Sequence, residues 1–199
     1  MFNFKILYKM EKNLSAQLQE EKKFHSYNYE SGNPALFVGT YAKYNDGNAL
    51  GGMWVDMTTF SDEEEFFDFC RLLHHDETDP EFGFWDYENM PYELYNESLC
   101  PDEIAEIIEF ANESDEHREV MEAYVDNYGW YKQLTWKEVE ERYQGKWDSE
   151  EEFAEHIFDE LYSYEISDFA RRYFDMEAFA RDLFAGEYVF VDGYVFSER

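Results

Sequence analysis

The chain is poor in cysteine and has no long apolar run. Its two cysteines, Cys70 and Cys100, show no C-x-x-C spacing, so neither a disulfide framework nor a thiolate metal site is predicted. The first twelve residues, MFNFKILYKMEK, lack the apolar segment and the cleavage site of a signal peptide. No stretch approaches the roughly 20 apolar residues that a membrane span needs. We therefore expect a cytoplasmic protein that has no membrane partner.

Basic residues are also scarce, with 16 Lys and Arg against 47 Asp and Glu, a formal net charge of −31. Because nucleic-acid-binding proteins present basic surfaces, this imbalance argues against a nucleic-acid ligand. It favours a basic protein surface or cations as the partner, with a generic acidic or salt-adapted surface as the alternative. Hydrophobic residues make up 44% of the chain and aromatic residues 21%, which predicts a folded core rather than a disordered acidic tail.

Motifs for catalysis and cofactor binding are absent from the sequence. There is no P-loop, G-x-G-x-x-G, H-E-x-x-H, G-x-S-x-G or EF-hand pattern, so we expect no enzyme activity and no cofactor. His74-His75-Asp76, joined by His117 or His156, could ligate a metal, but ligand spacing is missing and exposed residues at a helix end are the better interpretation. With 47 carboxylates, no catalytic pair can be singled out.

The predicted fold class is α+β, in a chain of three modules after an N-terminal extension. Residues 1–33 hold five lysines and four glutamates and are expected to be a weakly ordered extension, whereas the rest carries a net charge of −32. The modules are expected at 34–97 (small α+β), 98–132 (all-helical) and 133–199 (α+β with a C-terminal hairpin).

Periodicity and turn residues place the elements within these modules. Strands are expected at 35–41, 52–56 and 82–87, with the turn Tyr44–Gly47 after the first. Helices are expected over 61–75, from Pro101, over 114–127 up to Gly129, near 165–172 and over 176–184. Capping boxes are expected at Ser61–Glu64, Thr135–Glu138 and Ser149–Glu152. Asp192-Gly193 predicts a hairpin between 188–191 and 194–196.

Two predicted middle helices each carry one acidic line opposite an apolar face. On the first, the line is Asp102, Glu106, Glu109 and Glu113, opposed by Ile104, Ile107, Ile108 and Ala111. On the second, it is Asp115, Glu119, Glu122 and Asp126, opposed by Val120, Met121, Tyr124 and Val125. Four carboxylates over eleven residues span roughly 16 Å at about 1.5 Å per residue. One strand of B-DNA places a charge about every 3.4 Å, so the charge densities are comparable.

An acidic face opposite an apolar one is also what any amphipathic helix shows. An ordinary solvated face, however, interleaves Lys or Arg at i+4. Between residues 60 and 131 there are 23 acidic residues and only two arginines, Arg71 and Arg118. Since proteins break local rules mainly at functional sites, this shortage of counter-charge favours a functional surface.

Several short motifs, in their order and spacing from about Ala35 to the C-terminus, resemble the ArdA antirestriction proteins. They are Tyr41-Ala42-Lys43-Tyr44-Asn45-Asp46-Gly47, Gly51-Gly52-Met53-Trp54, Asp86-Tyr87-Glu88, Phe169-Ala170-Arg171-Arg172-Tyr173-Phe174-Asp175, Phe179-Ala180-Arg181-Asp182-Leu183 and the hairpin 188–196. The resemblance implies an elongated three-module homodimer, joined through its last module. It would mimic bent DNA, come from a mobile genetic element and bind the methyltransferase core of type I restriction–modification enzymes. Residues 1–33 are not part of the family pattern.

The resemblance carries over an acidic surface and no catalytic residue. That surface would comprise Glu63, Glu64, Glu65, Asp68, the two middle-helix lines Asp102, Glu106, Glu109, Glu113 and Asp115, Glu119, Glu122, Asp126, and finally Glu138, Glu140, Glu141, Glu151, Glu152, Glu155 and Asp159. Arg171, Arg172 and Arg181 are interpreted as structural. The alternative function is an acidic adaptor or inhibitor of another basic DNA-binding protein.

Overall fold

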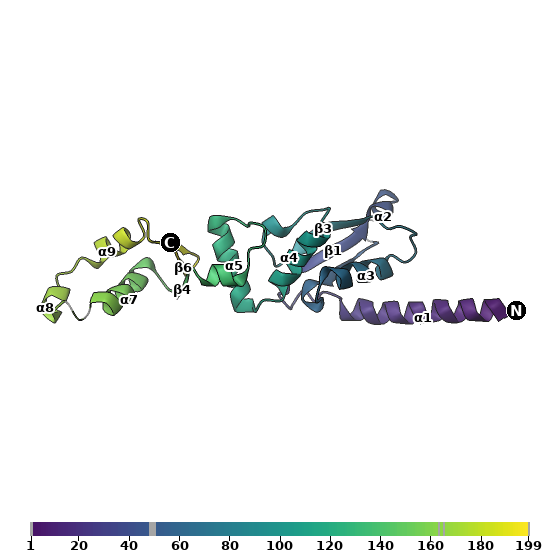
Figure 1. Cartoon of the computed structure of the whole chain (residues 1–199), viewed down its shortest axis with the longest axis horizontal. Coiled ribbons are helices and arrows are strands. Elements are labelled where there is room, and N and C mark those ends of the chain that lie inside the picture. Colours follow the sequence, from purple (N-terminus) through teal and green to yellow (C-terminus); the bar gives the residue numbers. More distant parts are fainter. Residues whose placement is uncertain (1, 48–50, 163, 165, 199) are drawn as a thin grey trace. The chain divides into compact units, whose positions relative to one another are not determined.

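The computed structural model describes residues 2–47, 51–162, 164 and 166–198 (Figure 1). The fold class is α+β, with two small antiparallel sheets. The chain forms two compact units, Met1–Ser114 and Asp115–Arg199. This division assigns the two predicted middle helices to different units, and the finer division into three modules stays a prediction. Within the described residues, none of the helices has both the length and the apolar character needed to cross a membrane.

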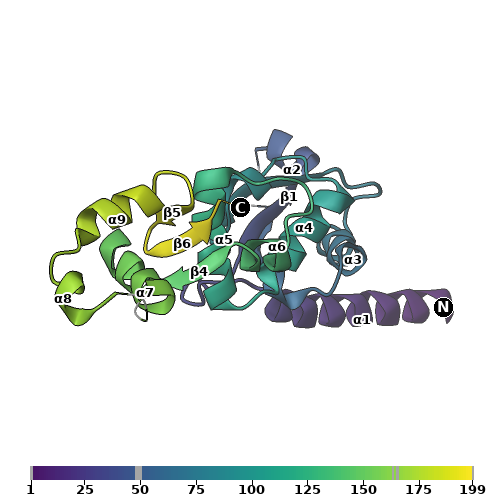
Figure 2. The same ribbon diagram turned by 60° about the vertical axis from the view of Figure 1, so that its left-hand side comes forward.

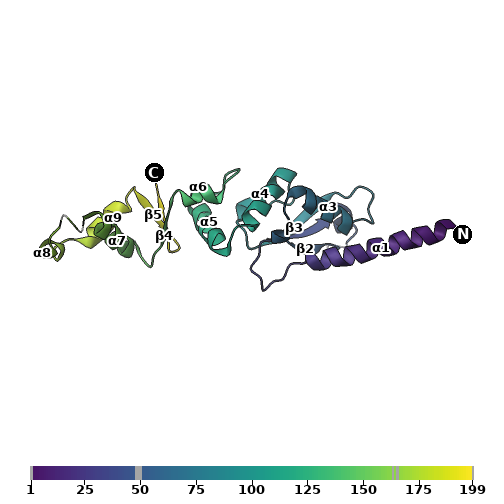
Figure 3. The same cartoon turned by 60° about the horizontal axis from the view of Figure 1, so that its bottom comes forward.

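The first unit is a three-stranded sheet with helices before, between and after its strands. Its elements are α1 (Phe2–Phe24), β1 (Ala35–Thr40), α2 (Tyr41–Asn45), β2 (Met53–Asp56), the 3-10 turn η1 (Met57–Thr59), α3 (Glu63–Leu73), β3 (Phe82–Glu88), the 3-10 turn η2 (Tyr92–Leu94) and α4 (Pro101–Ala111). The strand order is β2-β1-β3, antiparallel throughout. Figure 3 shows α3 and α4 beside this sheet. All three predicted strands are confirmed, each within one residue of its expected ends.

The core of the first unit lies between the sheet and α3 and α4. Leu36, Val38 and Val55 on the strands are fully buried, as is Phe66 on α3, whose ring centroid lies 6.0 Å from that of Phe84. Because strand side chains alternate, the intervening residues face the other side of the sheet. There the indole of Trp85 covers Gly39 and Gly83, where a Cβ atom would lie 2.4 Å from the ring. These two glycines therefore let Trp85 lie flat on the sheet.

The N-terminal segment, for which weak order stays a prediction, is helical over most of its length. It forms the 23-residue helix α1, whose N-terminal part extends beyond the rest of the first unit (Figure 1; Figure 3). At its other end Leu18, His25 and Tyr27 are buried. Ser26 forms a bridge to Val55, so the chain after α1 joins the edge of β2. The Lys, Glu, Gln and Leu residues of this segment are good helix formers, which accounts for the helix.

The second unit holds the other sheet and the remaining helices. Its elements are α5 (Asp115–Tyr128), α6 (Trp136–Glu140), β4 (Tyr143–Lys146), α7 (Glu150–Tyr162), α8 (Asp168–Arg171), α9 (Met176–Leu183), β5 (Tyr188–Val191) and β6 (Tyr194–Ser197). The strand order is β4-β6-β5, and α7 packs against α9 (Figure 2). The predicted hairpin is confirmed as β5 and β6, and Asp192 and Gly193 both have positive φ, as a type I′ turn requires.

The strand β4 and the short helix α2 were not expected from the sequence. The strand β4 has the half-polar sequence Tyr-Gln-Gly-Lys and lacks the alternation that would predict a strand. The short helix α2 occupies part of the predicted turn Tyr44–Gly47, and the hydroxyl of Thr40 accepts a hydrogen bond from the Lys43 N–H to cap it. The helix expected near 165–172 is observed as α8, and residue 165 lies outside the described residues.

Candidate functional site

The first group of predicted acidic residues lies on α3. Glu63 is half-buried, and Glu64, Glu65 and Asp68 are exposed. Glu63, Glu64 and Glu65 form the first turn, where the helix dipole favours negative charge. Glu65 accepts hydrogen bonds from both the backbone N–H and the hydroxyl of Ser61, and these bonds lower the pKa of its carboxyl. Part of this acidic group therefore serves the helix itself.

The cap of α3 corrects the sequence prediction by one residue. Asp62, not Ser61, is the N-cap, and its carboxylate accepts a 2.8 Å hydrogen bond from the Glu65 N–H. Further along the helix, Asp68 forms a 2.5 Å ion pair with Arg71. One of the two arginines in the acidic stretch is thus already paired within its own helix.

The α4 line has the arrangement that the helical periodicity predicts. Asp102 and Glu109 are exposed and Glu106 is half-buried, while Ile104, Ile107, Ile108 and Ala111 on the opposite side are buried. Glu113 is half-buried and lies two residues past Ala111, the last residue of the helix. Pro101 occupies the first helical position, and the Glu103 carboxylate accepts from the Cys100 N–H. The acidic line of α4 is therefore presented by a well-capped helix with a fully apolar back.

The α5 line is more involved in internal contacts than its sequence suggests. Arg118, only 8% exposed, pairs with Asp115 at 2.6 Å. Glu119 accepts a 2.8 Å hydrogen bond from the Tyr194 hydroxyl and lies 3.8 Å from the ammonium of Lys146. Arg118 and Lys146 thus supply counter-charge to this part of the line, and its place in a functional surface stays a prediction.

The other two residues of the α5 line differ in exposure. Asp126 is exposed and Glu122 is half-buried. Burial, followed by the negative charge of Asp126, raises the pKa of the Glu122 carboxyl. The buried side of α5 consists of Val120, Met121, Ala123, Tyr124 and Val125 together with Arg118.

The last group of predicted residues is exposed throughout. It comprises Glu138, Glu140, Glu141, Glu151, Glu152, Glu155 and Asp159. Glu138 accepts from the N–H and the hydroxyl of Thr135, as the predicted capping box requires. Ser149 caps α7 through the Glu152 N–H, although the Glu152 carboxylate reaches the Asp148 N–H instead of Ser149. Asp159 pairs with Arg171, whose guanidinium lies over the Phe158 ring, in keeping with a structural arginine.

None of the predicted site carboxylates is buried, but only some of them have no internal hydrogen bond or ion pair. Within the part of the chain that the structure describes, seven are exposed and have no hydrogen bond or ion pair of the carboxylate: Glu64, Glu109, Asp126, Glu140, Glu141, Glu151 and Glu155. These side chains are therefore available to contact a partner. Sequence alone could not separate them from the rest, because the separation depends on where distant residues such as Tyr194 and Lys146 lie.

A cation-holding cluster lies where the sequence showed only a weak metal signal. His74, Asp76 and Glu77 bring potential ligand atoms within 4.8 Å of one another. The Lys43 ammonium already lies among them, 2.9 Å from His74 Nδ1, 2.8 Å from Asp76 and 3.4 Å from Glu77. The cluster is therefore an internal ion-pair network in which a lysine holds the position that a metal would take.

The prediction that His74 is exposed at a helix end is wrong. Its side chain is fully buried, and burial followed by the Lys43 charge lowers the pKa of His74 to about 4. The other histidines considered with it belong to the second unit. His117 stacks on Trp136 with ring centroids 3.9 Å apart, and His156 lies 3.6 Å from Glu160.

Comparison with protein families decides the affiliation of the chain. A family model described as antirestriction protein (ArdA) matches residues 36–196. The chain belongs to the ArdA family. A search of curated proteins found no match. Membership of the ArdA family implies an antirestriction function against type I restriction systems, and hence interaction with type I restriction–modification enzymes. ArdA is a family of inhibitors and not a known enzyme family. The match begins in β1, so α1 precedes it.

Proposed function

We propose that this ArdA protein acts as a DNA mimic, whose surface carboxylates occupy the DNA-binding groove of a type I restriction–modification enzyme and block restriction and methylation. The observation that carries the proposal is the acidic line of α4. The carboxylates of this line recur on the side of the helix opposite a buried apolar face. Glu109, within the line, is exposed and has no hydrogen bond or ion pair of its carboxylate. A line of this charge density matches a DNA strand closely enough to compete for basic groups that contact phosphate.

The exposed carboxylates of the second unit would contribute further contacts in this proposal. Glu140 is the last residue of α6 and Glu141 is its C-cap, while Glu151 and Glu155 lie on the exposed side of α7. The net charge of −31 would also raise the rate at which the protein meets a basic groove, because long-range attraction steers such encounters.

We also propose that the protein is a homodimer joined through its second unit. Support comes from large apolar side chains that are exposed close together in the sequence, around the end of α7 and α8. They are Leu161, Tyr162, Tyr164, Phe169, Tyr173 and Phe174. Tyr164 is 97% exposed and Tyr173 76%. Apolar side chains that are exposed together in one patch mark interaction surfaces in soluble proteins, and we propose that these six form such a patch.

Competition with DNA tests the proposed function. The purified protein is titrated into a complex of a type I methyltransferase core with duplex DNA, across a range of salt concentrations, and released DNA is measured by fluorescence anisotropy. We expect displacement at low salt that weakens as salt rises, because ions screen the exposed charges. A protein that binds none of several type I cores at low salt would contradict the proposal.

A second candidate is an acidic inhibitor or adaptor of another basic DNA-binding protein. The observation that favours it is the partial neutralisation of the α5 line by Arg118 and Lys146, which interrupts a phosphate-like spacing. Running the same competition with unrelated DNA-binding enzymes separates the two candidates. Equal potency against all of them would support the second.

A further inference from the structure

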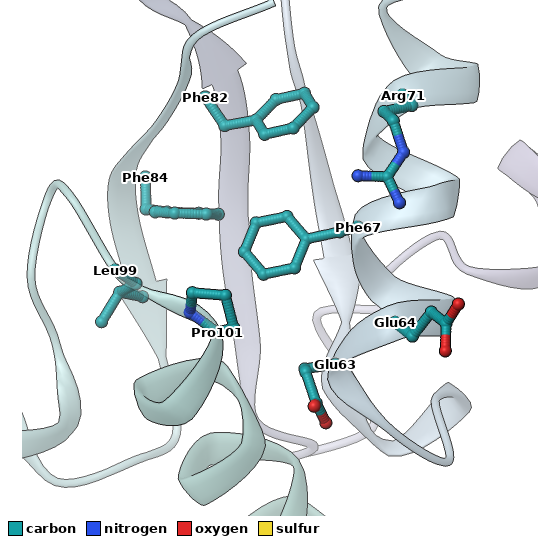
Figure 4. A pocket seen from close by; sticks show the side chains of 8 residues that line it. All are labelled: Glu63, Glu64, Phe67, Arg71, Phe82, Phe84, Leu99 and Pro101. Carbon is teal, nitrogen blue, oxygen red and sulfur yellow. The ribbon is translucent and has the colours of Figure 1, made fainter.

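A pocket of about 470 Å³ lies between α3, β3 and the start of α4 (Figure 4). Its lining consists of Phe67, Phe82, Phe84, Leu99 and Pro101, with Glu63, Glu64 and Arg71 at its borders. All of these residues belong to the first unit. The pocket is mostly apolar, which is the usual character of a site that receives an apolar group.

The walls of the pocket are aromatic side chains that the core leaves partly open. Phe84 and Leu99 are buried, whereas Phe67 and Phe82 are half-buried, with ring centroids 6.0 Å apart. Figure 4 shows the Phe67 ring pointing from α3 toward the rings of β3. The buried residues of α3 are Phe66, Phe69, Cys70 and Leu73, so Phe67 lies beside the core-facing side and not within it.

The charges around the pocket favour a basic neighbour. Glu63 and Glu64 lie in the first turn of α3, at one end of the pocket. Arg71 lies at the other end, and its charge is offset by the 2.5 Å pair with Asp68. The borders are therefore net negative. They complement an apolar side chain that is followed or preceded by Lys or Arg, and they oppose an acidic segment or a nucleic acid.

We propose that this pocket receives an apolar side chain from the basic protein that the chain inhibits, next to a Lys or Arg of that protein that pairs with Glu63 or Glu64. The inference rests on the proposed function and deepens it. Charge mimicry alone needs no apolar pocket, whereas protein–protein interfaces are commonly anchored by a few apolar or aromatic side chains in pockets. Such an anchor adds affinity that salt does not screen.

The test compares two phenylalanine variants of the full chain by the same competition with a type I methyltransferase core. Phe67→Ala removes a wall of the pocket, and Phe24→Ala removes a ring on α1 that is 64% exposed and is not part of the lining. We expect Phe67→Ala to weaken binding about tenfold to a hundredfold by the same factor at every salt concentration, the effect of losing one buried apolar contact. Phe24→Ala should bind like the unaltered protein, and Glu64→Gln should reduce the salt dependence instead.

A second measurement needs no substitution at the pocket. Cys100, between the lining residues Leu99 and Pro101, is exposed, whereas Cys70 is buried, so a maleimide labels Cys100 selectively in the folded protein. We expect the bound methyltransferase core to slow this labelling. Unchanged affinity of Phe67→Ala, or unprotected Cys100 in the complex, would overturn the inference while leaving the proposed function intact.

Two further results would also overturn it. If the unaltered protein binds no type I core, the proposed function and this inference fail together. If Cys100 becomes protected as the concentration of the protein alone rises, a second copy of the chain is the occupant and the inference is wrong.

Discussion

At the scale of single residues, the Lys43 network ties α2 to the segment that follows α3. The ammonium contacts His74, Asp76 and Glu77, and the Thr40 hydroxyl donates a 2.7 Å hydrogen bond to Glu77. Because Lys43 donates to His74 Nδ1, the neutral ring carries its proton on Nε2, which is buried without a hydrogen-bond partner among the described residues. The fold therefore holds His74 neutral.

This arrangement predicts how stability depends on pH. The pKa of His74 falls from 6.5 to about 4 on folding, so between these values the unfolded chain binds a proton that the folded chain excludes. The free energy of unfolding is therefore higher by an amount on the order of 3 kcal/mol above pH 6.5, where His74 is neutral in both states. This difference is lost as the pH falls toward 4. Urea unfolding of His74→Asn should show a shallower pH dependence in this window.

The matched control for that experiment is His75→Asn, since His75 is the exposed neighbour. It should keep the pH dependence of the unaltered protein. Identical slopes for His74→Asn and the unaltered protein would contradict the account of a histidine held neutral.

The burial of His74 has a signal in the sequence. Phe66, Cys70 and His74 recur at i, i+4 and i+8, so His74 continues the buried side of α3. The partner, Lys43, lies 31 residues earlier in the chain, and no local pattern connects the two.

At the scale of elements, capping decides where the acidic helix α3 begins. The Asp62 carboxylate accepts from the Glu65 N–H, while Glu65 in turn accepts from Ser61. Substituting an N-cap residue by Ala usually costs about 1 kcal/mol. Asp62→Ala should therefore lower the free energy of unfolding by about that amount, measured by urea denaturation. Ser61→Ala, which removes only an exposed side-chain hydrogen bond, should cost less, and the reverse order would contradict the assignment of the cap.

Elements with strong periodicity were predictable and short polar ones were not. The helices α4 and α5 follow directly from the spacing of Ile104, Ile107 and Ile108 and of Val120, Tyr124 and Val125. The strand β4 was missed because its pairing with β6 comes from residues about fifty positions away, such as Tyr143 with Phe196. Local sequence cannot indicate a strand whose stability comes from its neighbour.

At the scale of the whole molecule, only part of the excess negative charge lies on carboxylates that have no internal partner. The carboxylates of Glu65, Glu138 and Glu152 accept hydrogen bonds from backbone N–H groups at helix starts. Those of Asp68, Asp115 and Asp159 form ion pairs with arginines. The sequence could list the acidic residues on the polar helix faces, and in the structure none of the predicted ones is fully buried. It could not tell which carboxylates already have an internal partner, because that depends on tertiary contacts.

The proposed homodimer gives a prediction at the same scale. Phe169→Asp combined with Tyr173→Asp places charge in the exposed apolar group and should shift the protein from dimer to monomer in sedimentation experiments. Tyr92→Asp, at a residue 70% exposed in the first unit, is the control and should leave the mass unchanged. A monomer without any substitution, or a dimer that survives the double substitution, would show that this surface does not join two copies.

The central claim is that the positions of the carboxylates, and not the total negative charge, cause inhibition of the restriction–modification enzyme. The most direct test neutralises the α4 line with Asp102→Asn, Glu106→Gln and Glu109→Gln, and compares it with a variant of equal charge, Glu20→Gln, Glu30→Gln and Glu93→Gln, at exposed residues elsewhere. Affinity for a type I methyltransferase core is measured at low and high salt. We predict that the first variant loses about tenfold or more in affinity at low salt, because each lost contact contributes roughly 0.5 kcal/mol or more. The affinity of the second variant should change little. Equal losses for both would contradict the claim.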